Sequence, residues 1–200
     1  DLRDVDKAHD KAFDKDGRDH LMNSEPQNPL VTVVISTHNR GHLVGRAIAS
    51  VLAQTFRNFE LIIVDDASAD NTGEVVAGFH DERIRYIRHE TNKGGPAARN
   101  TGIRAARGQY IALLDDDDEW LPAKLDRQVA KMREAAGSVG LVYTGSELID
   151  KDGHVSKTYV PESAGDVSEK LLWGSLIGSV SRVLIKKECF DKTGLFDETL

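Results

Sequence analysis

The sequence predicts an α/β fold in which a mostly parallel sheet is sandwiched between helices. Three short, largely apolar runs are typical of strands buried on both faces. They cover Val31 to Ser36, which is mostly β-branched, Phe59 to Val64, and Tyr110 to Leu114. Stretches with helical periodicity separate these runs, which is typical of the crossovers that join parallel strands. With 200 residues, the chain can bury one substantial core.

The first half of the chain alternates strands and helices. After the strand at 31–36, apolar residues repeat at helical spacing from Leu43 to Gln54. A helix over about Thr72 to Phe79 follows the second strand. The third strand, Ile84 to Ile87, is shorter and more charged, so we expect it near an edge of the sheet.

The helices on either side of the strand at 110–114 carry recognisable start and stop signals. Pro96 suits the first turn of a helix over Ala97 to Arg107, and Gly108 suits its end. Pro122 opens a further helix, whose predicted inward face is Leu125, Val129 and Met132.

Five weaker elements are predicted towards the C-terminus. They are a strand at Val139 to Tyr143, a hairpin turning through Asp150 to Gly153, a helix at Val167 to Trp173, a strand at Arg182 to Ile185, and a short helix starting at Lys187.

Composition narrows the class of protein. The net charge of -7 argues against a nucleic-acid partner. The single cysteine, Cys189, excludes an internal disulfide and fits a reducing compartment. No apolar stretch reaches the length of a membrane span. We therefore expect a cytoplasmic chain, with peripheral membrane association left open, and we interpret the densely charged residues 1–28 as a linker or tail.

Polar clusters follow three of the predicted strands. Thr37 to Arg40 follows the first strand, Asp65 and Asp66 follow the second, and Asp115 to Asp118 follows the fourth. In an open parallel sheet, ligands bind beyond the carboxyl ends of the strands, where the strand order reverses. The sequence therefore predicts that these clusters form one site.

Four consecutive carboxylates constrain the ligand of such a site. Two carboxylates roughly 4 Å apart repel by about 4 kcal/mol at an effective dielectric constant near 20, so a compact cluster requires a cation. Oxygen ligands favour a hard ion, which points to Mg²⁺ or Mn²⁺. The alternative for the run taken alone is a solvated acidic loop.

Other nucleotide and phosphate motifs fit less well. The dinucleotide motif Gly-x-Gly-x-x-Gly should follow the first strand, where the chain instead has THNRGH, residues 37–42. Gly94 and Gly95 precede a helix and either expose amides to an anion or form a tight turn. Asp115 and Asp117 also leave open a Mg²⁺-dependent phosphohydrolase, although the expected threonine does not follow them.

Four blocks in order, and a fifth later, are similar to those of the family-2 inverting glycosyltransferases, whose fold is the Rossmann-like GT-A fold. The blocks are VVISTHNR (33–40), SVLAQTFRNFELIIVDDAS (50–68), NKGGPAARNTGI (92–103), YIALLDDDDEWLP (110–122) and GLFDE (194–198). The resemblance covers residues 29–200, which we interpret as one GT-A domain.

The resemblance implies transfer of a sugar, with inversion, from a nucleoside diphosphate donor to an acceptor hydroxyl. UDP is the usual nucleotide, the acceptor would be a saccharide or a lipid-linked molecule, and the product would belong to polysaccharide or glycoconjugate biosynthesis. A non-catalytic module that binds a nucleotide sugar is the alternative.

The resemblance also implies a role for each matching residue. Those expected to contact the donor, from the nucleoside to the metal, are Thr37, Asn39, Arg40, Asp66, Arg99, Asp115 and Asp116. Asp66 would accept a hydrogen bond from the base, and Asp117, which ends the DxD motif, would hold the Mg²⁺ or Mn²⁺ ion. His38 stands where many relatives carry Tyr or Phe.

The catalytic base is not among these residues. In the family it usually belongs to a Glu-Asp pair shortly after the GLFDE block, so we expect it beyond Leu200 and the C-terminal part of the domain to be missing. Asp197 and Glu198 match the block itself and are not candidates for the base.

Overall fold

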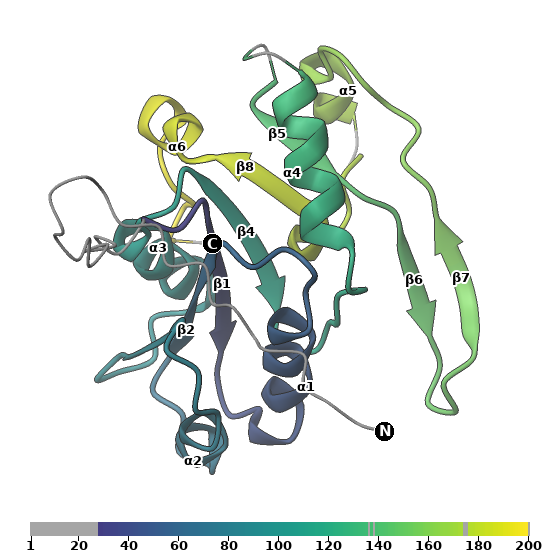
Figure 1. Ribbon diagram of the computed structural model, residues 1–200. Coiled ribbons are helices and arrows are strands. Elements are labelled where there is room, and N and C mark those ends of the chain that lie inside the picture. The colour runs from purple at the N-terminus through teal and green to yellow at the C-terminus, as the bar shows by residue number, and fades with distance from the viewer. Residues whose placement is uncertain (1–27, 136, 138, 174–175, 200) are drawn as a thin grey trace, which may run out of the picture.

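A six-stranded sheet forms the middle layer of the computed structural model of the chain, which describes residues 28–135, 137, 139–173 and 176–199 (Figure 1). In spatial order its strands are β3 (Ile84–Arg88), β2 (Phe59–Asp65), β1 (Val31–Thr37), β4 (Tyr110–Asp115), β8 (Val183–Lys186) and β5 (Leu141–Tyr143). The first four are parallel, whereas β8 runs antiparallel to both of its neighbours. The predicted mostly parallel sheet is confirmed, with β3 at an edge.

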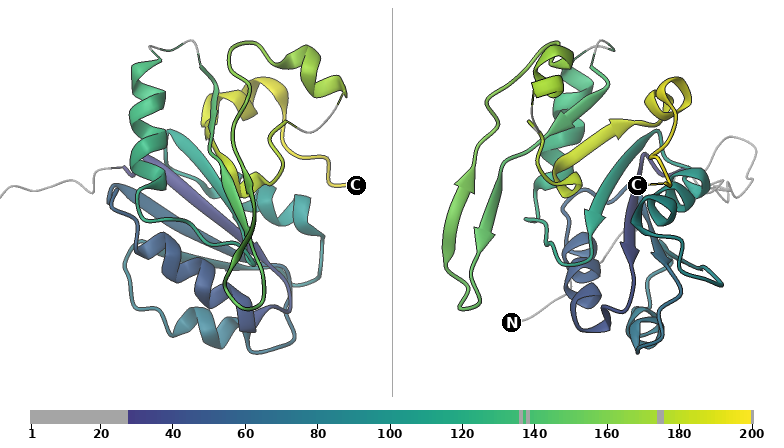
Figure 2. Two further views of the ribbon diagram at one scale, coloured as in Figure 1. Left: turned by 90° about the vertical axis from the view of Figure 1, so that its right-hand side faces the viewer. Right: turned by 180° about the vertical axis from the view of Figure 1, so that it is seen from behind.

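Helices cover both faces of the sheet, as its edge-on view shows (Figure 2). One face carries α1 (Gly41–Leu52), α2 (Thr72–Ala77) and α4 (Lys124–Glu134), and the other carries α3 (Gly95–Ala105) and α6 (Lys187–Thr193). The remaining helices are α5 (Ser168–Trp173) and the short 3₁₀ helix η1 (Val180–Arg182).

Side-chain alternation along β1 divides the core into two layers. Val33 and Ile35 pack in the layer that contains α1 and α4, whereas Val34 packs in the layer that contains α3. Because successive side chains of a strand point to opposite faces, a strand buried on both faces is mostly apolar. This explains why the apolar runs in the sequence were such clear indicators of the central strands.

The hairpin predicted around Asp150 forms a separate two-stranded sheet that stands apart from the main sheet (Figure 1). Its strands are β6 (Ser146–Ile149) and β7 (Val155–Tyr159). The carboxylate of Asp150 accepts hydrogen bonds from the N–H groups of Asp152 and His154, both at 2.9 Å, and so closes the turn.

Several element boundaries differ from those predicted. Helix α3 begins at Gly95 and ends at Ala105, two residues before Arg107. The Arg107 N–H donates to the Glu60 carboxylate at 2.7 Å, and this contact across the fold replaces a helical hydrogen bond. Strand β5 starts only at Leu141. Residues 1–27 of the predicted tail lie outside the described residues. No helix in the described ranges combines the length and hydropathy needed to cross a membrane.

The contact between α3 and β1 depends on a glycine. A Cβ atom at Gly102 would lie 2.3 Å from Val34 Cγ1, whereas one at Gly45 in α1 would meet Val75 Cγ1 at an ordinary 3.4 Å. We expect Gly102→Ala to lower the free energy of unfolding by about 1–3 kcal/mol through overpacking. Gly45→Ala, the matched control, should be neutral or stabilising because alanine is the better helix former. Urea denaturation checks both; a Gly102→Ala variant as stable as the control would contradict the prediction.

Candidate functional site

The carboxyl ends of β1, β2 and β4 meet at one edge of the sheet. Thr37 is in register with Asp65 on β2, and Ser36 is in register with Asp115 on β4. These three strands are neighbours, and the strand order reverses between β1 and β4. The loops that leave them therefore converge, as the sequence predicted.

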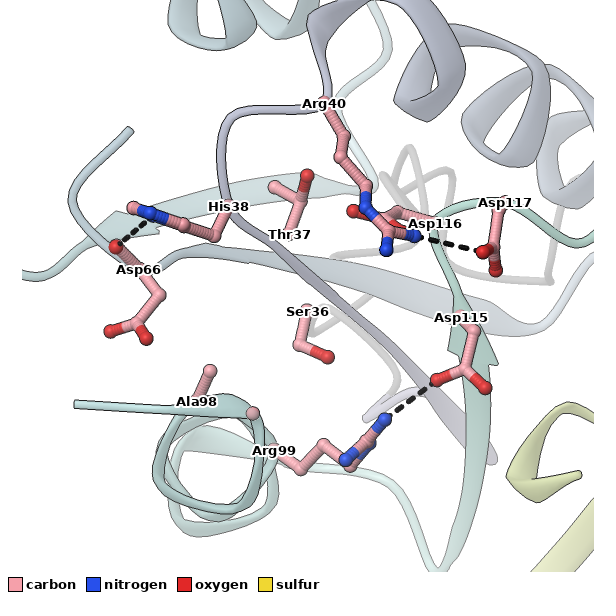
Figure 3. A pocket seen from close by; sticks show the side chains of 11 residues that line it. Ser36, Thr37, His38, Arg40, Asp66, Ala98, Arg99, Asp115, Asp116 and Asp117 are labelled. Carbon is pink, nitrogen blue, oxygen red and sulfur yellow. Dashed lines mark hydrogen bonds and ion pairs between the residues drawn. The ribbon is translucent and has the colours of Figure 1, made fainter. Parts of the chain in front are cut away.

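A cleft of about 430 Å³ lies at this edge (Figure 3). Its lining residues come from the three loops and from α3, and they are Ser36, Thr37, His38, Arg40, Asp66, Gly95, Ala98, Arg99, Asp115, Asp116 and Asp117. Every donor or metal residue that the resemblance implied lines this cleft, with the exception of Asn39. Of the wider polar clusters, Asp65 and Asp118 also do not line it.

Two arginines neutralise the aspartates at the end of β4. Arg40 Nη1 lies 3.0 Å from Asp116 Oδ1 and 2.8 Å from Asp117 Oδ2. On the other side of the cleft, Arg99 Nη2 lies 2.7 Å from Asp115 Oδ1. The repulsion that the acidic run implied is thus relieved by side chains from the β1–α1 loop and from α3.

The serine segment, residues 179–181, hydrogen-bonds to the aspartate run and was not predicted from the sequence. The Asp115 N–H donates to Ser181 Oγ at 3.0 Å, and the Ser179 hydroxyl donates to Asp118 at 3.2 Å. These serines lie more than sixty positions along the chain from their partners. No local pattern could have identified them.

Asp116 is the most buried of the three β4 aspartates that line the cleft. Burial raises the pKa of its carboxyl group, while the Thr37 hydroxyl and the Arg40 guanidinium oppose this increase. Thr37 Oγ1 is itself buried and has no hydrogen-bond partner of normal geometry within the described part of the chain. Thr37 and Arg40 thus both favour the charged form of the buried Asp116 carboxylate.

Asp66 is held by the turn that precedes α3. Its carboxylate accepts from the N–H groups of Lys93 at 2.9 Å and Gly94 at 2.7 Å, and from His89 Nδ1 at 2.7 Å. Burial alone would raise the pKa of Asp66, but these hydrogen bonds outweigh it and lower the pKa. The Gly94 amide is thus committed to Asp66, which supports the tight-turn interpretation of the glycine pair. The contact between Asp66 and a base stays a prediction.

The sequence analysis did not predict His89 as a site residue. The rule used for the others, that polar residues directly after a parallel strand lie at one edge of the sheet, also applies to it. It comes directly after β3 and so lies at the same edge of the sheet. Its ring connects Asp66 to Thr101 of α3, whose hydroxyl is 2.9 Å from Nε2.

Asn39 joins two loops and does not line the cleft. Its N–H donates to Ser68 Oγ at 2.9 Å, and its side-chain oxygen accepts from the Ala69 N–H at 2.7 Å. Its φ of 54° lies in the left-handed region, which asparagine tolerates better than most residues. The neighbouring His38 Nδ1 donates to the carbonyl oxygen of Asp66 at 2.7 Å. Both residues thus position the β1 loop against the β2 loop.

A buried lysine lies beneath the aspartate loop. Lys124 Nζ is 3.8 Å from the centroid of the Trp120 ring and donates to Gln128 Oε1 at 2.8 Å. Trp120 in turn donates through Nε1 to the Ser181 carbonyl at 2.8 Å. Burial lowers the pKa of Lys124 to about 7. Trp120 is therefore a packing residue that links α4 to the serine segment.

The side chains at the cleft suit a hard cation that takes most of its ligands from elsewhere. Among the described residues, no group of three or more His, Cys, Asp or Glu side chains is arranged to hold a metal ion. The Asp117 side chain is 49% exposed and offers carboxylate oxygens. Mg²⁺ characteristically binds one or two carboxylates together with substrate phosphates and water, so the donor set fits such an ion.

The sheet topology and the cleft at its switch point define the chain as a doubly wound α/β protein with a ligand site at the carboxyl ends of its strands. Residues 32–192 match the family model "Glycosyl transferase family 2". The chain therefore belongs to glycosyl transferase family 2, as the resemblance implied.

Individual relatives agree with this assignment. The chain is 37% identical over 155 residues to the UDP-Glc:alpha-D-GlcNAc-diphosphoundecaprenol beta-1,3-glucosyltransferase WfgD of Escherichia coli, which covers 78% of this chain and 60% of the relative. The chain thus spans about 60% of the length of this curated relative.

Solved structures support the GT-A fold. The structure of S. aureus TarS 1-349 in complex with UDP matches with a TM-score of 0.69 at 24% identity, over 85% of this chain and 51% of that one. The mannosyltransferase PcManGT from Pyrobaculum calidifontis, in complex with GDP-Man and Mn²⁺, matches with a TM-score of 0.65 at 20% identity, over 88% and 49% of the two chains.

The buried lysine gives a prediction for pH dependence. Between the folded pKa of about 7 and an unfolded value near 10.4, the unfolded chain holds a proton on Lys124 that the folded chain lacks. The free energy of unfolding should therefore rise with pH across this window, by at most about 1.4 kcal/mol per pH unit. Lys124→Met should flatten that rise, whereas the exposed Lys131→Met should not. Urea denaturation at several pH values from 7 upward checks this; equal slopes in wild type and Lys124→Met would contradict it.

Proposed function

We propose that this chain binds a nucleoside diphosphate sugar, with UDP as the nucleotide, and transfers the sugar with inversion to a hydroxyl of a saccharide or lipid-linked acceptor. The observation that carries the proposal is the convergence of Asp66, Arg40, Arg99 and the aspartates of β4 around one cleft at the switch point. Family membership supports the reaction class. The UDP in the TarS complex and the UDP-Glc in the name of WfgD support the choice of nucleotide.

The two ends of the cleft suit the two ends of such a donor. The Asp66 end offers hydrogen-bonding groups, among them the Asp66 carboxylate, for the nucleoside. The other end offers the guanidinium groups of Arg40 and Arg99, and arginine pairs well with phosphate oxygens. We therefore assign the nucleoside to the first end and the diphosphate to the second.

We assign a divalent ion, Mg²⁺ or Mn²⁺, to Asp117, with Asp115 and Asp116 beside it. When bound, such an ion would stabilise the negative charge that the diphosphate gains as it leaves the sugar. The Mn²⁺ bound with GDP-Man in the Pyrobaculum structure supports this choice of ion. Asp117 suits the role because half of its side chain is exposed to the cleft.

Inversion requires a carboxylate that takes the proton of the acceptor hydroxyl on the face opposite the leaving group. Glu198 does not suit this role, because its carboxylate accepts from Asn100 Nδ2 at 2.8 Å and from Arg104 at 3.0 Å on the α3 side of the fold. The Glu-Asp pair expected after the Gly194–Glu198 block remains our candidate for the base.

The setting of the reaction is part of the proposal. The acceptor in the name of WfgD is a diphosphoundecaprenol lipid. A lipid-linked acceptor of this kind, used in polysaccharide or glycoconjugate biosynthesis, would bring a cytoplasmic enzyme to the membrane surface by peripheral contact.

Replacing the proposed metal ligand tests the assignment. Asp117→Ala should abolish the Mn²⁺-dependent part of UDP binding, because the ion that connects protein and diphosphate loses its carboxylate. Calorimetric titration with UDP, GDP and dTDP, with and without Mn²⁺, measures this and ranks the nucleotides; we expect UDP to bind tightest.

Glu119→Ala is the matched control. Glu119 belongs to the same acidic run but pairs with Arg46 at the surface and does not line the cleft. Its loss should leave Mn²⁺-dependent UDP binding within about two-fold, as expected for a surface ion pair. Unchanged affinity in Asp117→Ala would refute the assignment of the metal. Release of inorganic phosphate from a phosphate monoester, without any sugar transfer, would favour a phosphohydrolase instead.

A further inference from the structure

Arg40 occupies an unusual position between two neighbouring carboxylates. A single nitrogen, Nη1, contacts both Asp116 Oδ1 at 3.0 Å and Asp117 Oδ2 at 2.8 Å (Figure 3). The Asp116 charge raises the pKa of Arg40, so the group is firmly cationic. The guanidinium thus joins the two aspartates as a bridging cation would.

This contact involves the residue proposed to hold the metal. Asp117 Oδ2 is engaged by Arg40, and the adjacent Asp116, whose side chain is only 8% exposed, has Arg40 as its cationic partner. A divalent ion that approaches Asp117 must therefore compete with an internal positive charge, both for an oxygen ligand and electrostatically.

The Arg40 side chain has the freedom to move away from the two aspartates. Its side chain is 45% exposed, and it extends from the loop between β1 and α1. Within the described part of the chain, its Nε and Nη2 groups make no hydrogen bond, and the residue lines the cleft. Guanidinium groups bind phosphate oxygens through paired N–H donors, so a diphosphate in the cleft offers Arg40 a second set of partners.

We propose that Arg40 is a displaceable internal cation: it bridges Asp116 and Asp117 and moves to the phosphates of an incoming nucleoside diphosphate, which releases Asp117 to a divalent ion. The inference rests on the proposed function, because it requires a diphosphate and a metal in this cleft. Its consequence is thermodynamic coupling, since the metal alone must displace Arg40, whereas the diphosphate removes that competitor.

The test is a titration of the chain with Mn²⁺ alone, in which the EPR signal measures the concentration of free Mn²⁺. Arg40→Gln should bind Mn²⁺ about five-fold to ten-fold more tightly than wild type, as expected from removing a partly exposed ion pair. Arg40→Lys keeps a cation within reach of the aspartates and should stay close to wild type. Near-ultraviolet circular dichroism verifies that each variant is folded.

Arg46→Gln is the matched control for loss of positive charge. Arg46 pairs with Glu119 beside the acidic run, and its side chain is 65% exposed. Its removal should change the Mn²⁺ affinity by less than about two-fold, because a surface charge is well screened. An equal gain in Mn²⁺ affinity in Arg46→Gln would mean that the loss of any nearby positive charge has this effect, and it would overturn the proposal.

Repeating the titration with saturating UDP tests the coupling. UDP should tighten Mn²⁺ binding several-fold less in Arg40→Gln than in wild type, because the competitor is already gone. If wild type binds Mn²⁺ with UDP but Arg40→Gln binds Mn²⁺ alone no more tightly than wild type, the exchange is wrong and the proposed function stands. If wild type binds no Mn²⁺ even with UDP, the metal assignment fails, and this inference fails with it.

Discussion

Repulsion among the carboxylates at the end of β4 is the constraint on which the site depends. Strand β4 is buried along most of its length, so the sheet delivers these aspartates to one place and leaves them little room to separate. Arg40 and Arg99 relieve the repulsion from opposite sides. Ser181 accepts from the backbone N–H of Asp115, and Ser179 donates to the carboxylate of Asp118. The fold thus supplies the aspartates with cations from two separate elements.

The location of the site follows from how the core is built. Parallel strands in register end at the same level, and helices on both faces close off the rest of the sheet. The edge between β1 and β4 is where the connections diverge, so the loops there can surround a ligand. Membership in glycosyl transferase family 2 gives this geometry its chemical interpretation.

The sequence predicted what depends on local pattern, and it could not predict what depends on distant contacts. The central strands could be predicted because burial on both faces favours short, mostly apolar runs. The cleft could be predicted because polar residues follow three of these strands. The antiparallel direction of β8 could not be predicted, since the sequence of a four-residue strand carries no signal of its orientation. The two serines that support the aspartates could not be predicted either, nor could the role of Asn39 in joining two loops. His89 could have been included, because it too follows a strand of the sheet.

The hydrogen bonds that tie Asp66 to the turn before α3 give the cleft two mechanically different ends. At the Asp66 end, backbone hydrogen bonds to the buried Asp66 carboxylate fix the shape of the cleft before any ligand binds, so little ordering remains to be done there. At the aspartate end, partly exposed ion pairs can exchange partners at small cost. A nucleoside without phosphates would therefore bind at an end of the cleft whose shape is already fixed. The ion pairs of Arg40 and Arg99 at the other end would stay as they are.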